Sequence, residues 1–203
     1  MAVAGVAAVA ADHIRTEPRL TRLPERLSTR LPSGDEDSSF IWAAVAAILT
    51  PDPEAILLIR RAERAGDPWS GHMALPGGRR EPGDPDLLAT VVRETAEELG
   101  VSLSGIRPAG ILEDVIPRTP VLPPVAVRPF VFVLPNRPLL TPNHEIASAQ
   151  WVSLDDLLDP GAYHPVRLTV AQQSREFPAY QIENALIWGM TERILTNLLD
   201  HVR

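Results

Sequence analysis

The segment that most constrains the fold is residues 77–101, which carry the signals of an amphipathic helix at both ends. Asp84 suits the N-cap, Pro85 suits the first helical position, and Gly100 suits a left-handed residue that ends the helix. Apolar and small side chains recur along one side, which predicts that this side packs against a sheet. These side chains are Leu88, Val91, Val92, Thr95 and Leu99. We therefore predict a helix from Asp84 to Gly100.

The opposite side of this helix carries three carboxylates, Glu94, Glu97 and Glu98. Residues three and four apart are neighbours on a helix surface, so these like charges repel one another. Mg²⁺ or Mn²⁺, which prefer oxygen ligands, would relieve the repulsion. Glu94 and Glu98 are the preferred ligands, and Glu97 either joins them or orients them with Arg93 as its partner. An acidic helix face is also common as a solvated surface, but the preceding Gly77-Gly78 turn lets backbone approach a metal or ligand closely.

The remaining chain is expected to form short strands and two more helices in no regular alternation. Strands are predicted at 40–49, 55–59, 109–115, 125–134 and 149–152, and helices at 153–158 and 185–201. Ser153 is the expected N-cap of the first helix, and Leu186, Met190, Ile194 and Leu198 form the apolar side of the second. This mixture predicts an α/β fold, a sandwich in one domain at residues 38–203, after a Pro- and Arg-rich N-terminal extension at 1–37.

Two missing residue types narrow the chemistry. The chain has no cysteine, and its 19 basic residues are all arginine. Disulfides, cysteine nucleophiles, zinc-thiolate sites and lysine-based catalysis are therefore excluded. The formal net charge of −7 predicts a surface that repels nucleic acid. No apolar run reaches the roughly 18 residues of a membrane span, so we expect a cytoplasmic protein that binds no membrane.

The glycine turn and the helix together resemble the box of the Nudix hydrolases. That box places a glycine and a leading glutamate before the run R-E-U-x-E-E-x-G-U, where U is aliphatic. Arg93-Glu94, Glu97-Glu98 and Gly100-Val101 match the run in register, and Thr95 replaces one aliphatic residue.

The first half of the box departs from the family pattern. The interval from Gly78 to Arg93 is one residue longer than the standard spacing. Pro85 stands at the position of the leading glutamate, so the neighbouring Asp84 is interpreted as a helix cap. The same one-residue expansion is a feature of the coenzyme A pyrophosphatase-like branch of the family.

Two stretches before the helix are similar to motifs of that branch. Leu57–Ala62 is similar to its L-L-x-x-R-S motif, and Gly71–Gly78 to its G-x-x-x-F-P-G-G motif. Ala62 replaces the serine, Leu75 replaces the phenylalanine, and Ser70 stands where a basic residue is usual. The resemblance implies an α/β/α sandwich with a mixed β-sheet. It also implies metal-dependent hydrolysis of a phosphoanhydride in a nucleotide, expected to be coenzyme A or an acyl-CoA, by a protein expected to form a homodimer.

Catalytic roles follow from the same resemblance. Hydrolysis needs a general base near the attacking water, and Glu145, in a loop outside the box, is the leading candidate. Glu113 and Asp114 are alternatives, at the end of a predicted strand. We predict that Glu97 and Arg93 act with the base, and that Glu81 is a weaker candidate ligand.

Substrate contacts are predicted on the segment before the helix. Arg60 and Arg61 are expected to bind phosphates, because guanidinium groups form paired hydrogen bonds with them. Trp69 either stacks on a nucleobase or packs in the core, and His72 either contacts phosphate or has a structural role. Gly77-Gly78 is expected to line the site. Arg64 is a further phosphate candidate for which a surface ion pair is the favoured alternative.

Three other functions remain as alternatives. The altered residues at 68–72 allow a Nudix hydrolase of another substrate, such as ADP-ribose, a dinucleoside polyphosphate or a dNTP. A non-catalytic binding module is disfavoured, because a pure binder has no need of three crowded carboxylates. A nucleic-acid-directed hydrolase is disfavoured by the net charge of −7.

Overall fold

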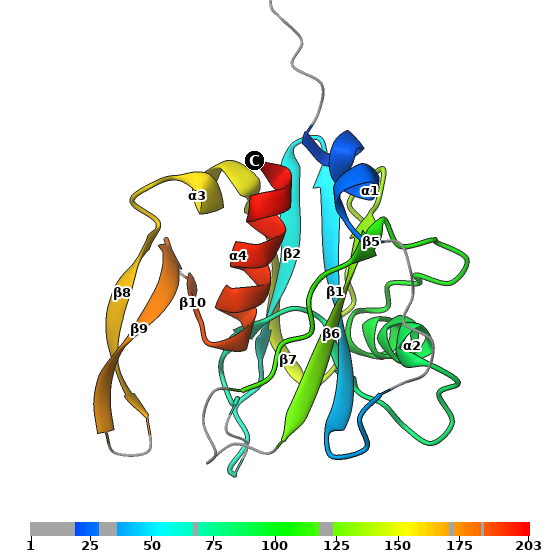
Figure 1. The fold of residues 1–203 in the computed structure, drawn as a ribbon, viewed down its shortest axis with the longest axis horizontal. Helices are drawn as coiled ribbons and strands as arrows, with labels where there is room; N and C mark the ends of the chain where they lie inside the picture. The colour runs from blue at the N-terminus through cyan, green and yellow to red at the C-terminus, as the bar shows by residue number, and fades with distance from the viewer. Residues whose placement is uncertain (1–18, 29–35, 67–68, 118–123, 171–172, 184) are drawn as a thin grey trace, which may run out of the picture.

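A seven-stranded mixed sheet forms the centre of the computed structural model, which describes residues 19–28, 36–66, 69–117, 124–170, 173–183 and 185–203 (Figure 1). Its strands run in the order β3-β2-β1-β6-β5, with β4 also paired to β1 and β7 to β2. The pair β1–β6 is parallel and the other pairs are antiparallel. The strands are β1 (Ile41–Pro51), β2 (Glu54–Arg61), β3 (Met73–Ala74), β4 (Gly77–Arg79), β5 (Gly110–Ile111), β6 (Val125–Val133) and β7 (Ile146–Ser153).

Two helices of equal length cover the two faces of this sheet, α2 (Leu87–Leu99) and α4 (Met190–Val202), as Figure 1 shows. Alternate side chains of a strand point to opposite faces. In β2, Leu57 belongs to the apolar cluster under α2, whereas Leu58 belongs to the cluster under α4. The predicted α/β/α sandwich with a mixed sheet is therefore confirmed.

Helix α2 starts later than predicted. Its N-cap is Asp86, whose side chain accepts a hydrogen bond from the Ala89 N–H, so the assignments of Asp84 as N-cap and Pro85 as first helical residue were wrong. The physical reason is that the Asp84 carboxylate is already occupied by other donors. The predicted end is confirmed, since Gly100 has a left-handed φ of 68°.

The N-terminal part that the structure describes packs on the core. A 3₁₀ turn (η1, Arg19–Arg22) and a short helix (α1, Leu23–Arg26) place Leu20, Leu23 and Leu27 in the apolar cluster under α4. Residues 19–28, within the predicted extension, therefore cover one end of the domain.

The C-terminal region contains a second sheet that the sequence did not predict. Its strands, in the order β10-β9-β8, are β8 (Tyr163–Val170), β9 (Gln173–Ile182) and β10 (Ala185–Trp188). Figure 1 shows the β8–β9 hairpin standing beside α4, away from the central sheet. The prediction of one helix over 185–201 was wrong in its first four residues, because they pair with β9 instead.

The remaining predictions differ in detail. The strand predicted at 109–115 shrinks to β5, with Val115 making one isolated bridge to Val127. The short helix α3 (Leu154–Leu158) begins after Ser153, whose side chain accepts a hydrogen bond from the Asp155 N–H, as predicted. No helix in the described part of the chain is long and apolar enough to cross a membrane.

Candidate active site

Gly77 and Gly78 face two carboxylates of α2, but the prediction that they form a turn was wrong, because both pair with β1 as part of strand β4. The Gly77 N–H donates a hydrogen bond of 2.8 Å to Glu98 Oε2. Gly77 has a φ of 142°, and a Cβ there would overlap the carbonyl of Ala44 on β1. A Cβ at Gly78 would overlap the carboxylate of Glu94. Both positions therefore require glycine, one for the backbone path and one to leave room for a carboxylate.

Burial dominates the electrostatics of Glu98 and Glu94. Glu98 is only 2% exposed, and its burial raises the pKa of its carboxyl to about 7. The charges of Glu94 and Glu145 raise it as well, whereas the Gly77 N–H and the charge of Arg61 lower it. Burial also raises the pKa of Glu94, and Arg93 opposes that shift. The fold thus brings the charges of Glu94, Arg61 and Glu145 close enough to act on Glu98.

Arg93 is fixed by a residue whose role the sequence did not reveal. Its Nε and Nη2 donate to the two carboxylate oxygens of Asp84, at 3.0 and 2.8 Å. Asp84 is buried and also accepts from the Thr90 hydroxyl and the Glu81 N–H. The hydrogen bonds from Arg93 hold the pKa of Asp84 well below its usual range. The one sequence signal for this role was that Asp84 stands next to the position of the leading glutamate in the Nudix box pattern.

From this anchor Arg93 reaches the metal-site candidates. Its Nη1 donates to Glu94 Oε1 at 3.0 Å and to Glu97 Oε2 at 3.1 Å. Glu97 has a side chain 57% exposed, whereas Glu94 is half-buried and Glu98 is buried. The charge of Glu81 acts on Glu94 and raises its pKa. The predicted carboxylates thus divide into an inner pair, Glu94 and Glu98, and the more exposed Glu97 and Glu81.

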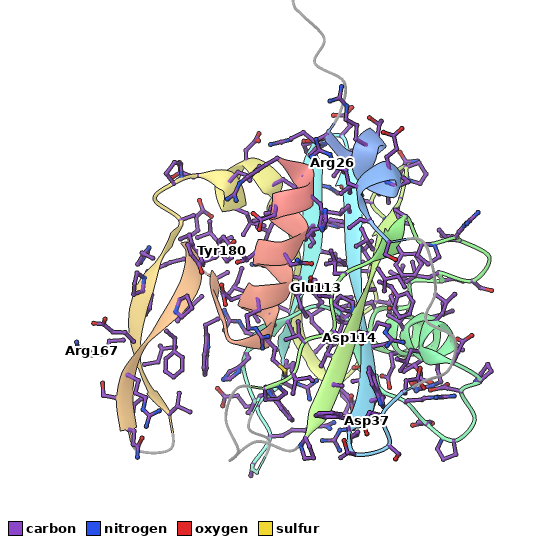
Figure 2. The ribbon with its side chains drawn as sticks, in the orientation of Figure 1. Arg26, Asp37, Glu113, Asp114, Arg167 and Tyr180 are labelled. Carbon is purple, nitrogen blue, oxygen red and sulfur yellow. The ribbon has the colours of Figure 1, made fainter. Side chains whose placement is uncertain are left out.

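Glu145 directly precedes β7 and lies opposite the end of β2. Its neighbours there include Arg64, and Arg61 pairs with the next residue of the chain, Ile146. Its carbonyl accepts from the Ala62 N–H, and its carboxylate forms a 2.7 Å ion pair with Arg64. The alternative base Asp114 is instead held by Arg128, whose Nε and Nη2 donate to it at 2.9 and 2.8 Å. Glu113 is exposed and lies next to it in the chain (Figure 2).

The residues predicted to contact substrate lie at the end of β2 and in the loop that connects β2 to β3. Arg60 Nη1 donates to the Gly71 carbonyl at 3.2 Å, and the Arg61 N–H donates to the His72 carbonyl. The His72 ring lies 4.7 Å from the ring of Trp188 on β10. Trp69 packs against the cluster under α4, which accords with the packing alternative for this side chain.

The residues present fit a divalent cation. In the described ranges no three histidine or acidic side chains converge into a complete cage. Half-buried Glu94 and buried Glu98 nevertheless offer hard oxygen ligands whose ionised forms are disfavoured by burial. A bound cation would stabilise the ionised carboxylates against their burial and against the repulsion between them. Mg²⁺ characteristically binds through one or two carboxylates and completes its shell with waters and substrate phosphates.

Comparisons with known proteins identify the family of this chain. The NUDIX domain model matches residues 41–173. The chain is 28% identical over 192 residues to an uncharacterized Nudix hydrolase, NudL, of Yersinia pestis (strain Pestoides F), which covers 90% of this chain and 94% of the relative. It is 42% identical over 110 residues to an uncharacterized protein of Schizosaccharomyces pombe, covering 52% of this chain but only 33% of that protein.

Solved structures show the same fold. A MutT/nudix family protein from Enterococcus faecalis aligns with a TM-score of 0.57 at 19% identity, over 85% of this chain and 64% of that one. A bifunctional NMN adenylyltransferase/ADP ribose pyrophosphatase from Francisella tularensis, complexed with AMP and a Mn ion, aligns with a TM-score of 0.55 at 17% identity, over 81% and 42% of the two chains. Since the family model spans more than half of its residues, this chain belongs to the Nudix family and is a pyrophosphohydrolase.

Proposed function

We propose that this enzyme hydrolyses the pyrophosphate linkage of coenzyme A or an acyl-CoA, with Mg²⁺ or Mn²⁺, and releases 3',5'-ADP and a 4'-phosphopantetheine. The observation that carries the proposal is the carboxylate pair of half-buried Glu94 and buried Glu98, which lies against Gly77 and Gly78 of β4, with the charge of Arg61 acting on Glu98. Arg61 belongs to the stretch that resembles the coenzyme A branch, and the lengthened turn before α2 is the second feature of that branch.

The reaction joins a water oxygen to one phosphorus and breaks the bond from that phosphorus to the bridging oxygen. The bridging oxygen leaves with the other phosphate, and a carboxylate takes the proton of the water. We assign that proton to Glu145, whose charge acts on Glu98 from the end of β2. When bound by Glu94 and Glu98, the cation neutralises phosphate charge and lowers the pKa of water. Arg93 orients Glu94, and Arg60 and Arg61 bind the phosphates.

A different nucleoside diphosphate derivative is the second candidate. Ser70 stands where the coenzyme A branch has a basic residue, which removes a positive charge from the loop before the glycines. The Francisella neighbour, which has the same fold, includes an ADP ribose pyrophosphatase. ADP-ribose, dinucleoside polyphosphates and dNTPs are therefore the alternative substrates.

A substrate panel separates these candidates. Purified enzyme is incubated with coenzyme A, ADP-ribose, diadenosine polyphosphates and dNTPs, with Mg²⁺ or Mn²⁺, and products are identified by mass spectrometry. We expect coenzyme A to have the highest kcat/KM. Reaction in ¹⁸O-labelled water identifies the attacked phosphorus from the labelled product. Turnover of another substrate without cleavage of coenzyme A would overturn the coenzyme A assignment and leave the reaction class intact.

The assembly and location are proposals of the same kind. A homodimer accompanies the resemblance to the coenzyme A branch, and the absence of cysteine fits a cytoplasmic location. Light scattering coupled to size-exclusion chromatography measures the mass in solution, which for one chain is 22.2 kDa. A mass of one chain across the working concentration range would exclude the dimer.

A further inference from the structure

We propose that Glu36, in the segment before β1, is a positioning residue for the metal site, which it reaches through Arg80 and the Asp84–Arg93 pair. The inference rests on the proposed metal role of Glu94. It gives a function to a residue of the predicted N-terminal extension, and it concerns ion pairs that lie outside the Nudix box motif.

Glu36 is held from the side of the central sheet. Its side chain is 12% exposed, and its Oε1 lies 3.5 Å from Nη1 of Arg128 on β6. Arg128 is itself fixed by the paired hydrogen bonds that it donates to Asp114 and by the ring of Trp42, whose centroid lies 4.9 Å from the guanidinium carbon. Figure 2 shows Asp114 beside β6, with the neighbouring Asp37 nearer the start of β1. Glu36 therefore has a rigid anchor in the sheet.

Arg80 connects this anchor to the turn before α2. Its Nη1 lies 2.6 Å from Glu36 Oε2. Its Nη2 donates to the Pro85 carbonyl at 2.7 Å and to the Asp84 carbonyl at 3.2 Å, and its Nε also donates to the Asp84 carbonyl. The guanidinium thus binds Glu36 on one side and the backbone of the lengthened turn on the other. Since that turn has one residue more than the standard box, it needs such a support to hold a fixed path.

The same turn carries the side chain that fixes Arg93. Asp84 accepts two hydrogen bonds from Arg93, and Arg93 donates one to Glu94. A shift of the Asp84 backbone therefore moves the Arg93 guanidinium, and with it the orientation of Glu94. Partners of metal ligands tune the affinity of a site because they hold the ligand in its binding geometry. The alternative role of Glu36 is to tie the N-terminal segment to the sheet, with no effect on the metal site.

The test compares Glu36→Gln with Asp37→Asn. Both variants remove one negative charge, but Asp37 is turned to its own segment, where its Oδ1 accepts from the Ser39 N–H. Mn²⁺ binding is titrated without substrate, by electron paramagnetic resonance of the free ion, and kcat, KM and thermal midpoint are measured in parallel. For Glu36→Gln we expect Mn²⁺ binding and kcat to weaken by about threefold to tenfold, with KM for substrate within about twofold of wild type. Asp37→Asn should leave Mn²⁺ binding, kcat and KM unchanged.

A second pair of variants keeps the proposal testable if Glu36→Gln folds poorly. Arg80→Lys keeps a positive charge for Glu36 but loses the fork that binds two carbonyls, so it should weaken Mn²⁺ binding as Glu36→Gln does. The double variant Glu36→Gln/Arg80→Lys should be no weaker than Arg80→Lys alone, because both changes break one connection. If Glu36→Gln lowers only the thermal midpoint and binds Mn²⁺ like wild type, the positioning role is wrong. A wild type that binds Mn²⁺ but hydrolyses no phosphoanhydride would refute the proposed function instead.

Discussion

The two faces of the central sheet bury helices of equal length but opposite character. The α4 face is packed with Ile194, Leu195, Leu198 and Leu199, and its one buried acid, Glu192, accepts hydrogen bonds from the hydroxyls of Tyr163 and Thr196. The α2 face also has an apolar cluster, but it adds the buried carboxylates of Asp84 and Glu98.

This difference separates what stabilises the fold from what performs the chemistry. Burying apolar surface without charge is favourable, whereas a buried carboxylate disfavours folding unless it is paired. Asp84 has such a partner in Arg93, and Glu98 accepts a hydrogen bond from the Gly77 N–H and has a raised pKa. The buried carboxylate on the α2 face therefore lowers the stability of the fold unless a cation compensates its charge. The apolar packing of the α4 face contributes the stability that offsets this loss.

The largest expected effect breaks the chemistry on the α2 face. Glu98→Gln keeps the size of the side chain and an acceptor for the Gly77 N–H, but removes the charge that would bind the cation. Because a bound cation contributes several kcal/mol to the transition state, we expect kcat/KM to fall by about a thousandfold. Steady-state kinetics measure the loss, and circular dichroism should show a wild-type fold. Activity within about tenfold of wild type would refute the metal role of Glu98.

A substitution in the apolar packing of the α4 face should lower stability and leave catalysis unchanged. Leu195 is fully buried on α4, and Leu195→Ala leaves a cavity. We expect the free energy of unfolding to fall by about 3 kcal/mol, with kcat at 25 °C within about twofold of wild type. Urea denaturation measures the first quantity and steady-state kinetics the second. A large loss of kcat in a folded Leu195→Ala protein would show that the two faces are coupled.

Much of the α2 face was predictable because its signals are local. Gly100, the apolar stripe and the spacing of Glu94 and Glu98 depend only on helix periodicity and end geometry. Asp84 was misassigned since Asp84 and Asp86 both satisfy the preference for an N-cap. The choice between them is made by Arg93, nine residues away, which recruits Asp84 into an ion pair.

The C-terminal region was less predictable because its structure depends on distant pairing. Strand β8 is exposed at most positions, so it lacks the alternation of apolar and polar residues that marks a half-buried strand. Leu186 extends the apolar stripe of α4 backwards by one helical turn, which made 185–201 look like one helix. Its pairing with Gln181 on β9 makes it part of a strand instead. The contacts of Glu36 with Arg80 and Arg128 are likewise tertiary and leave no sequence signal.

The buried carboxyl group of Glu98 predicts that the stability of the metal-free protein depends on pH. The folded state raises the pKa of Glu98 from 4.5 to about 7, so between these values it binds more protons than the unfolded state. Its contribution is fully present below pH 4.5 and is lost as the pH rises through 7, by about 3 kcal/mol. Urea denaturation in EDTA from pH 5 to pH 8 measures this fall, which Glu98→Gln should abolish. Mn²⁺ should restore stability at the high end of the range in wild type and not in the variant. An equal slope in both proteins would assign the pH dependence to other groups.

The smallest expected effect concerns the single buried acid of the α4 face. The Tyr163 hydroxyl donates to Glu192 Oε1 at 2.9 Å and so ties the β8–β9 hairpin to α4. Tyr163→Phe removes this bond but leaves the Thr196 hydroxyl, 3.1 Å from the same oxygen, and the packing of ring 163 on the Tyr180 ring. Because Glu192 keeps a donor, we expect a loss of only about 1 kcal/mol in unfolding free energy and no change in kcat. Thr196→Val, which removes the other donor, is the matched comparison. If Tyr163→Phe instead changed KM, the hairpin would belong to the substrate site, and the division between a stabilising face and a catalytic face would have to be redrawn there.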